Sequence, residues 1–296
     1  MGTFRSTGSR SLAVLLGLVS LLLTVVVPIP AAAAGTAPSL ELGLYDQQMS
    51  QLAWNTNGMP SPQIAVTYYA WGEGFQAGFS QLAQARGAEP FVELGSWQCT
   101  WLCQGTGLPT LNSIAAGTYD KTYLIPFARS LAAYKSPVLI TWDHEMNGLY
   151  GPYPWMNQSP AQYIAAWRHV YDVMHPIAPN ATWVWAPNAQ IGEGGVAQYF
   201  PGNAYMQEWG VDCYLSSPGQ TYASACASTV AVIRGLTHDP GMLSETGIEN
   251  SQGRPPRVTQ LVQAARAAGL TALVWFDKGA SFLHWGGRRA MQEALR

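Results

Sequence analysis

The chain has 296 residues, only 11% of them charged, and a formal net charge of −2 at pH 7 without any cluster of lysine or arginine. This balance excludes a nucleic-acid-binding protein, which needs a basic patch to neutralise phosphates. The chain also has 12 tryptophans and 14 tyrosines. Packing in the core is the ordinary role of any one of them, but so many flat rings also suit stacking against sugars.

The first segment has the layout of a secretory signal. Arg5 and Arg10 make its start basic, Leu12–Ile29 is apolar, and Ala31–Ala34 offers small residues for cleavage. We expect cleavage near Ala34 and a secreted, extracellular protein. A permanent membrane anchor is the alternative, because the apolar stretch is just long enough to span a bilayer.

The remainder, residues 35–296, has the size of one α/β barrel domain. Without the two arginines of the leader it has 13 basic and 17 acidic residues, a net charge of −4. No later segment is apolar for long enough to cross a bilayer, so we expect no stable membrane association after cleavage. We also expect a monomer.

Short apolar runs alternate with amphipathic stretches along this domain. Gly, Pro, Asn or Asp bound each run, as is typical of strands. The predicted strands are Leu40–Leu44, Ile64–Tyr69, Pro90–Leu94, Val138–Trp142, Trp183–Trp185, Gly210–Cys213, Met242–Ser244 and Ala272–Trp275. The predicted helices are Gln47–Trp54, Gly74–Ala85, Tyr119–Ala133, Pro160–His175, Ala223–Gly235, Arg257–Ala268 and Gly287–Leu295, and the helix after the fifth strand is the least clear.

Eight strands separated by helices predict an α/β fold with a parallel sheet, and eight units favour closure into a single (β/α)8 TIM barrel. An open doubly wound sheet is the rival. That fold usually has a glycine-rich phosphate turn after its first strand, whereas Leu44, Tyr45 and Asp46 stand there.

The even number of cysteines in an exported chain predicts two disulfides. Three connectivities are possible, and we prefer Cys99–Cys103 with Cys213–Cys226 because each pair brackets a loop-like segment. A zinc site is a weak alternative, since Cys99 and Cys103 have no well-spaced partner pair.

Two glutamates fall where barrel enzymes place their reacting groups, at the C-terminal ends of strands. Glu145 follows the fourth strand with His144 and Asn147 beside it, and Glu245 follows the seventh. Hydrolysis of a glycosidic bond needs two carboxyls, one to protonate the departing oxygen and one to attack or to activate water. Asp143 lies two residues before Glu145 and, on a regular strand, would raise its pKa.

Other catalytic classes lack their motifs. His144-Glu145 begins like a zinc-protease motif, but Gly148 stands where the second histidine belongs. The sequence contains neither a Gly-x-Ser-x-Gly elbow nor a P-loop. No metal or cofactor is expected.

Several segments together resemble glycoside hydrolase family 26, the β-mannanase family. His-Glu-Met-Asn-Gly at 144–148 with Tyr-Pro-Trp at 153–155 is similar to its acid/base signature, and Ser-Glu-Thr-Gly at 244–247 to its nucleophile segment. Further similar segments, in the same order along the chain, are Gly117–Asp120, Ala166–His169, Trp183–Asn188, Tyr199–Gly202 and Trp209–Tyr214.

The resemblance implies a (β/α)8 barrel that hydrolyses β-linked polysaccharides with retention of configuration. Glu145 then matches the acid/base and Glu245 the nucleophile. Tyr214 matches a tyrosine that hydrogen-bonds the nucleophile, and Trp275 falls where the last strand usually presents an aromatic floor. His144, Asn147 and Trp155 complete the expected substrate-binding residues.

The chain departs from the family beside the acid/base. Thr141 stands where members usually carry arginine, Asp143 replaces a small residue, and the segment up to Trp155 is two residues longer. These changes bear on the substrate more than on the reaction. We expect a polysaccharide as partner, β-mannan first. β-Glucan or β-xylan, or an inactive carbohydrate-binding barrel, are the alternatives.

Overall fold

The computed structural model describes residues 2, 39–50, 54, 56, 58–97, 109–148, 153–156, 158–189, 195–248, 254–278 and 285–296. The expected leader, apart from Gly2, and the expected Cys99–Cys103 bridge lie outside the described residues, so both remain predictions. Within the described ranges no helix combines the length and apolar character that a membrane crossing requires.

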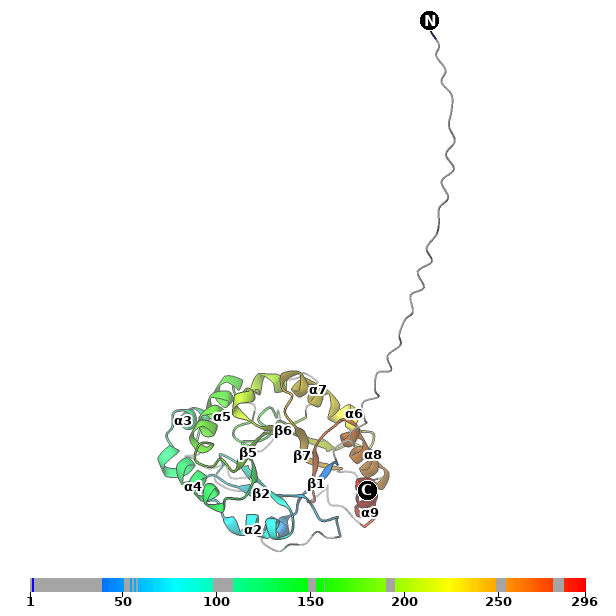
Figure 1. Cartoon of the computed structure of the whole chain (residues 1–296), viewed down its shortest axis with the longest axis horizontal. Helices are drawn as coiled ribbons and strands as arrows, with labels where there is room; N and C mark the ends of the chain where they lie inside the picture. The colour runs from blue at the N-terminus through cyan, green and yellow to red at the C-terminus, as the bar shows by residue number, and fades with distance from the viewer. Residues whose placement is uncertain are drawn as a thin grey trace. The chain divides into compact units, whose positions relative to one another are not determined.

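Eight parallel strands close into a barrel in chain order, β1 to β8 (Figure 1). They are β1 (Glu41–Tyr45), β2 (Ile64–Tyr69), β3 (Glu89–Leu94), β4 (Val138–Trp142), β5 (Ala181–Trp185), β6 (Glu208–Leu215), β7 (Gly241–Ile248) and β8 (Ala272–Phe276). Pairing of β1 with β8, from Glu41 beside Ala272 to Tyr45 beside Phe276, closes the ring. The predicted (β/α)8 fold is therefore confirmed.

The helices surround the strands (Figure 1). They are α1 (Gln47–Ser50), α2 (Ala77–Ala85), α3 (Leu111–Ala115), α4 (Ile125–Tyr134), α5 (Pro160–Met174), α6 (Tyr222–Ala225), α7 (Ala227–Leu236), α8 (Arg254–Ala267) and α9 (Trp285–Leu295). A π-helical segment, Asp120–Leu124, precedes α4, and two 3-10 turns, Gly195–Tyr199 and Asn203–Tyr205, follow β5.

Alternation along the strands separates two cores. Ile64, Val66, Phe91 and Val274 belong to the smaller core inside the barrel. The alternate positions, together with the apolar faces of the helices, form the larger core outside the barrel. This arrangement follows from the period of two along a strand, which sends successive side chains to opposite faces of the sheet.

The strand predictions were right in number and place, while several helix boundaries were wrong. Sequence reasoning missed α3, and it merged α6 and α7 into one helix. Thr110 and Thr221 explain both starts, because each caps its short helix through a side-chain bond from the backbone N–H of Ser113 or Ser224.

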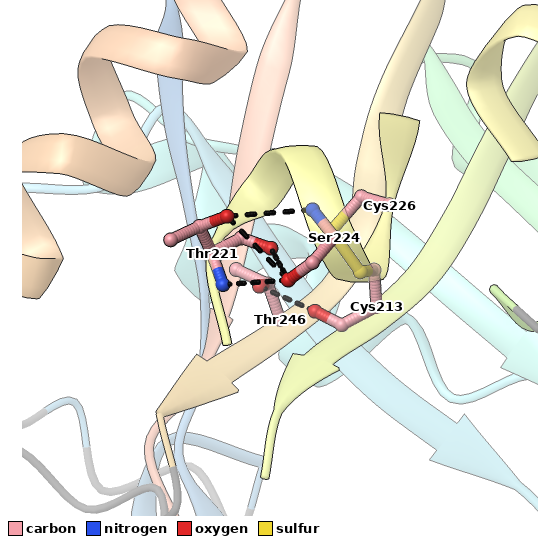
Figure 2. The surroundings of a disulfide bond; sticks show 5 residues. All are labelled: Cys213, Thr221, Ser224, Cys226 and Thr246. Carbon is pink, nitrogen blue, oxygen red and sulfur yellow. Dashed lines mark hydrogen bonds between the residues drawn. A yellow bond between two sulfur atoms is a disulfide. The ribbon is translucent and has the colours of Figure 1, made fainter. Parts of the chain in front are cut away.

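The predicted bridge between Cys213 and Cys226 is present. It ties β6 to the start of α7, as Figure 2 shows. The Thr246 hydroxyl donates to the Cys213 carbonyl at 2.6 Å, which fixes the same part of β6 against β7. The bridge therefore anchors the strand end that carries Tyr214.

Candidate active site

Glu145 and Glu245 both lie at the C-terminal ends of barrel strands. Glu145 is in the turn that follows β4, which ends at Trp142, and Glu245 is within β7. Burial first, and then the negative charge of Glu245, raise the pKa of Glu145, so the two carboxyls interact electrostatically. The strand order brings together groups that lie far apart in the sequence.

A turn with unusual backbone angles presents Glu145. Asp143 and Glu145 have φ values of 45° and 54°, in a region that side chains other than glycine seldom adopt. The N–H of Glu145 donates to the Ala186 carbonyl at 2.8 Å, which holds the turn against β5. Such strain in a barrel mouth is common at functional sites, where the surroundings enforce it.

Asn188 contacts the Glu145 carboxyl directly. Its side-chain amide donates to Oε1 of Glu145 at 2.6 Å. Asn147 holds Asn188 in turn, since its amide group accepts from the Asn188 N–H and donates to the Asn188 carbonyl, both at 2.8 Å. Asn147, which we expected to bind substrate, therefore positions the partner of Glu145.

The environment of Glu145 favours its protonated form. Burial and the charge of Glu245 raise its pKa to about 8, against a lowering by the Asn188 hydrogen bond. The side chain is nevertheless only partly buried, so it can reach a substrate. A carboxyl that keeps its proton at neutral pH and faces the barrel mouth is suited to donate that proton.

Two tyrosine hydroxyls hold Glu245, one on each oxygen. Tyr214 donates to Oε2 at 2.6 Å, and Tyr68 donates to Oε1. The hydrogen bond expected from Tyr214 is thus present, and Tyr68 adds a second. Burial raises the pKa of Glu245 while both hydrogen bonds lower it, because donors stabilise the ionised carboxylate.

His144 lies beside a buried carboxyl that sequence reasoning missed. Its Nδ1 is 3.2 Å from Oε2 of Glu93, a residue of β3 that is 1% exposed. Burial lowers the pKa of His144 to about 3, and burial followed by the charge of Glu245 raises the pKa of Glu93 well above its usual range. Both shifts favour the neutral forms of the two groups, and neutral groups do not form an ion pair.

Trp155 supports His144 from the loop after β4. Its indole N–H donates to the His144 carbonyl at 2.6 Å, and its ring stacks on Tyr153 with centroids 4.7 Å apart. Trp155 is almost fully buried, whereas Tyr153 is partly exposed. Two cavities border Trp155, one of them lined also by Glu93 and His144.

Asp143 does not act on Glu145 as expected. Its carboxylate accepts from the N–H and hydroxyl of Ser96 at 2.6 and 2.7 Å, and it does not contribute to the raised pKa of Glu145. The reason is that β4 ends at Trp142, so the alternation on which the expectation depended stops there. Asp143 instead joins the ends of β3 and β4.

The structure directs the Trp275 side chain into the larger core, although its backbone pairs with Thr246, the neighbour of Glu245. The side chain is fully buried and packs in the larger core, outside the barrel. The next residue, Phe276, is partly exposed and packs against the smaller inner core, with its ring 6.2 Å from Tyr214 and 6.4 Å from Tyr68. The aromatic side chain that β8 places next to the two tyrosines of Glu245 is therefore Phe276.

Four residues of the site escaped sequence reasoning: Tyr68, Glu93, Asn188 and Asp212. Asp212 of β6 is 1% exposed and accepts from the Ser244 hydroxyl at 2.6 Å. Tyr68 and Glu93 lie near the C-terminal ends of β2 and β3, Asp212 lies within β6, and Asn188 follows β5. Such positions were themselves a usable signal, because C-terminal strand ends meet at one edge of a barrel.

Comparison with known proteins supports a family assignment. The family model described as glycosyl hydrolase family 26 matches residues 120–252, a range that includes both glutamates and Asn188. This match spans 133 of the 296 residues and supports assignment of the chain to that family. The protein is a glycoside hydrolase. No curated protein sequence matches the chain.

Solved structures share the fold at low sequence identity. A family 26 β-mannanase from Bacteroides ovatus superposes with a TM-score of 0.64 at 16% identity, covering 88% of this chain and 89% of that one. An endo-β-1,4-mannanase double mutant from Cellulomonas fimi gives 0.65 at 15%, covering 87% and 70%. The YdhT protein from Bacillus subtilis gives 0.60 at 19%, covering 85% and 84%.

Proposed function

We propose that this family 26 enzyme is a secreted retaining hydrolase that cleaves a β-linked polysaccharide by double displacement. Glu145 is the acid/base and Glu245 the nucleophile. The observation that carries this assignment is the contrast between the two carboxyls. Glu145 has one amide donor and a pKa near 8, whereas Glu245 has a tyrosine hydroxyl on each oxygen.

The contrast assigns one task to each residue. In the first step Glu145 gives its proton to the departing glycosidic oxygen while Glu245 attacks the anomeric carbon. In the second step Glu145, now ionised, takes a proton from water as the water displaces Glu245. Retention requires the two carboxyls to lie about 5–5.5 Å apart, too close for a water to act between them.

β-Mannan is our first choice of substrate, since two solved structures with the same fold are named as mannanases. Glu93 and His144 border a cavity in the site, and their buried polar atoms suit the hydroxyls of one sugar ring. We propose Phe276, in place of Trp275, as the aromatic contact at the end of β8. Reducing-sugar release from mannan, β-glucan and β-xylan tests the choice.

Azide rescue tests the roles of the two glutamates. Glu245→Ala removes the attacking group, so activity should fall by several orders of magnitude on every substrate. Glu145→Ala removes only proton assistance, so hydrolysis of an aryl glycoside with a good leaving group should persist while that of polysaccharide is lost. Azide should then give a β-glycosyl azide with Glu145→Ala and an α-glycosyl azide with Glu245→Ala.

Glu208 offers a matched control. It is the first residue of β6, at the opposite end of the barrel, and burial raises its pKa to about 7. Glu208→Ala should therefore retain activity and give no azide product. The reverse azide products would exchange the two roles, and full activity in both catalytic variants would place the active site elsewhere.

A further inference from the structure

Three side chains of the site form a cluster with the composition of a metal site. Ligand atoms of Glu93, His144 and Glu245 lie within 4.8 Å of one another. The three residues come from β3, the turn after β4, and β7. They are 1%, 3% and 7% exposed.

Two members of the cluster lack hydrogen bonds to the part of the chain that the structure describes. Both carboxyl oxygens of Glu93 and both ring nitrogens of His144 are buried without such a bond. Tyr68 lies beside Glu93 as well, but its hydroxyl proton goes to Glu245. Buried polar atoms normally have partners, so these four atoms suit a ligand.

A small cavity borders the two residues. Its volume is about 50 Å³, and Tyr68, Tyr153 and Trp155 also line it. A cavity needs about 10–15 Å³ of accessible space to hold one water molecule, so this one has room for a single small ion. The aromatic walls offer an ion few competing ligands.

We propose that Glu93, His144 and Glu245 bind one divalent cation of the zinc class, and that this ion inhibits the enzyme. Zinc prefers histidine nitrogen and carboxylate oxygen, and bonds of ~2.0–2.2 Å in a tetrahedron place neighbouring ligands about 3.4 Å apart. Nδ1 of His144 and Oε2 of Glu93 are 3.2 Å apart. Only Glu245 has to approach. Magnesium and calcium fit less well, because they prefer oxygen ligands only.

The charges of the site favour such an ion. Glu93 and Glu245 lie near two further acidic side chains, Asp212 and Glu145. A divalent cation would offset the negative charge that these carboxyl groups bring together. Once Glu245 is a metal ligand it cannot attack a sugar, so inhibition should be competitive with substrate.

Calorimetry on the purified, chelator-treated protein tests the site directly with zinc. We expect one zinc per chain, with release of protons. Glu93→Gln and, separately, His144→Gln should weaken binding by at least about tenfold, the smallest loss typical of disturbing a metal site. Cobalt added in place of zinc should give the intense visible absorption of a tetrahedral site, and both substitutions should abolish it.

His169 provides the matched control. It also pairs with an acid, since its Nε2 is 2.8 Å from Oδ1 of Asp120, but this pair lies on the π-helical segment and α5. His169→Gln should leave the cobalt spectrum and the zinc affinity of the site unchanged. Circular dichroism identifies any variant that fails to fold. Since Glu93→Gln and His144→Gln each remove one ligand, a single folded variant is enough to test the site.

Kinetics test the inhibition, which rests on the proposed function. Zinc should raise the apparent KM for polysaccharide without changing kcat, and a chelator should restore activity. Unchanged zinc affinity in a folded Glu93→Gln or His144→Gln variant would overturn the site. Zinc bound at the site without inhibition would overturn the inhibitory role. If no polysaccharide is hydrolysed, the proposed function fails while calorimetry and the cobalt spectrum still decide the metal site.

Discussion

The hydrogen bond from Asn188 to Glu145 should affect the upper pH limit of activity. In the proposed mechanism Glu145 has to be protonated to act as the acid, so kcat/KM should fall as the pH rises through about 8, the pKa given by burial and the charge of Glu245. Asn188→Ala removes a donor that lowers this pKa, and the basic limb should therefore move to higher pH. A pH profile of kcat/KM measures the shift. If the basic limb does not move, Asn188 does not control the pKa of the catalytic acid.

The two tyrosines on Glu245 set the opposite limit. In the proposed mechanism Glu245 has to be ionised to attack, and both hydrogen bonds lower its pKa. Tyr214→Phe or Tyr68→Phe should therefore move the acidic limb to higher pH. A hydrogen bond to a charged group contributes about 1.5–3 kcal/mol, so kcat/KM should fall roughly 10- to 100-fold.

Tyr134→Phe is the control for these two substitutions. The Tyr134 hydroxyl donates to the Ser80 carbonyl at 2.9 Å, between α4 and α2. The same chemical change at this place should leave both limbs of the profile unmoved. An equal loss in the control would trace the effect of the active-site tyrosines to stability.

At the scale of elements, the bridge between β6 and α7 should contribute to stability and to activity together. It joins residues 13 apart in sequence, and closing a loop of about this length stabilises a protein by about 3 kcal/mol. Replacing Cys213 and Cys226 by alanine should lower the unfolding temperature. It should also lower kcat, because Tyr214 follows Cys213 directly.

Thermal unfolding with and without a reducing agent measures the first effect. Reduction should lower the midpoint of the wild-type protein by more than that of the double-alanine variant. Equal responses would mean that this bridge adds no stability.

Sequence reasoning found the strands more reliably than the ends of the elements. Apolar runs bounded by turn residues located all eight strands, but β7 was expected over Met242–Ser244 and runs over Gly241–Ile248. Its last residues are not apolar enough to predict a strand, and they extend because they pair with β6 and β8. Glu245 consequently lies inside the strand.

The candidate site was predictable where a local motif marked it. Glu145, Glu245 and Tyr214 belong to recognisable segments, whereas Tyr68 and Glu93 lie in β2 and β3, outside any such segment. Their contacts with Glu245 and His144 come from other parts of the barrel, so the sequence alone does not reveal them. We expected Trp275 to form an aromatic floor in the site. Side chains alternate along β8, however, and this alternation directs Trp275 to the outer core and Phe276 to the inner one.

At the scale of the whole molecule, one closed ring brings the site together. Residues of the site come from β2, β3, β6 and β7 and from the turns after β4 and β5. Parallel strands place all their C-terminal ends at one edge, so closure between β1 and β8 determines the distances among groups on the other strands. The pairing of β1 with β8, the seam of the barrel, must therefore be stable for the site to keep its geometry.

Gly43 tests the seam. It pairs with Val274 between β1 and β8, and a Cβ built there would lie 2.5 Å from Cγ2 and 3.0 Å from the backbone Cα of Val274. Gly43→Ala should therefore overpack the seam and destabilise the protein by about 1–3 kcal/mol. For a domain of this size, each kcal/mol lowers the unfolding temperature by about 2–4 °C.

Gly235→Ala makes the same chemical change with the opposite expected sign. Gly235 lies exposed in α7 and a Cβ there meets nothing within 4 Å, so alanine should stabilise the helix by about 0.5–1 kcal/mol. Thermal unfolding of the two variants compares them directly. Since the Gly43 clash is partly with Cγ2 of Val274, adding Val274→Ala to Gly43→Ala should cost less than the sum of the two single changes. Additive losses, or a Gly43→Ala variant as stable as the wild type, would show that the seam has room for a methyl group.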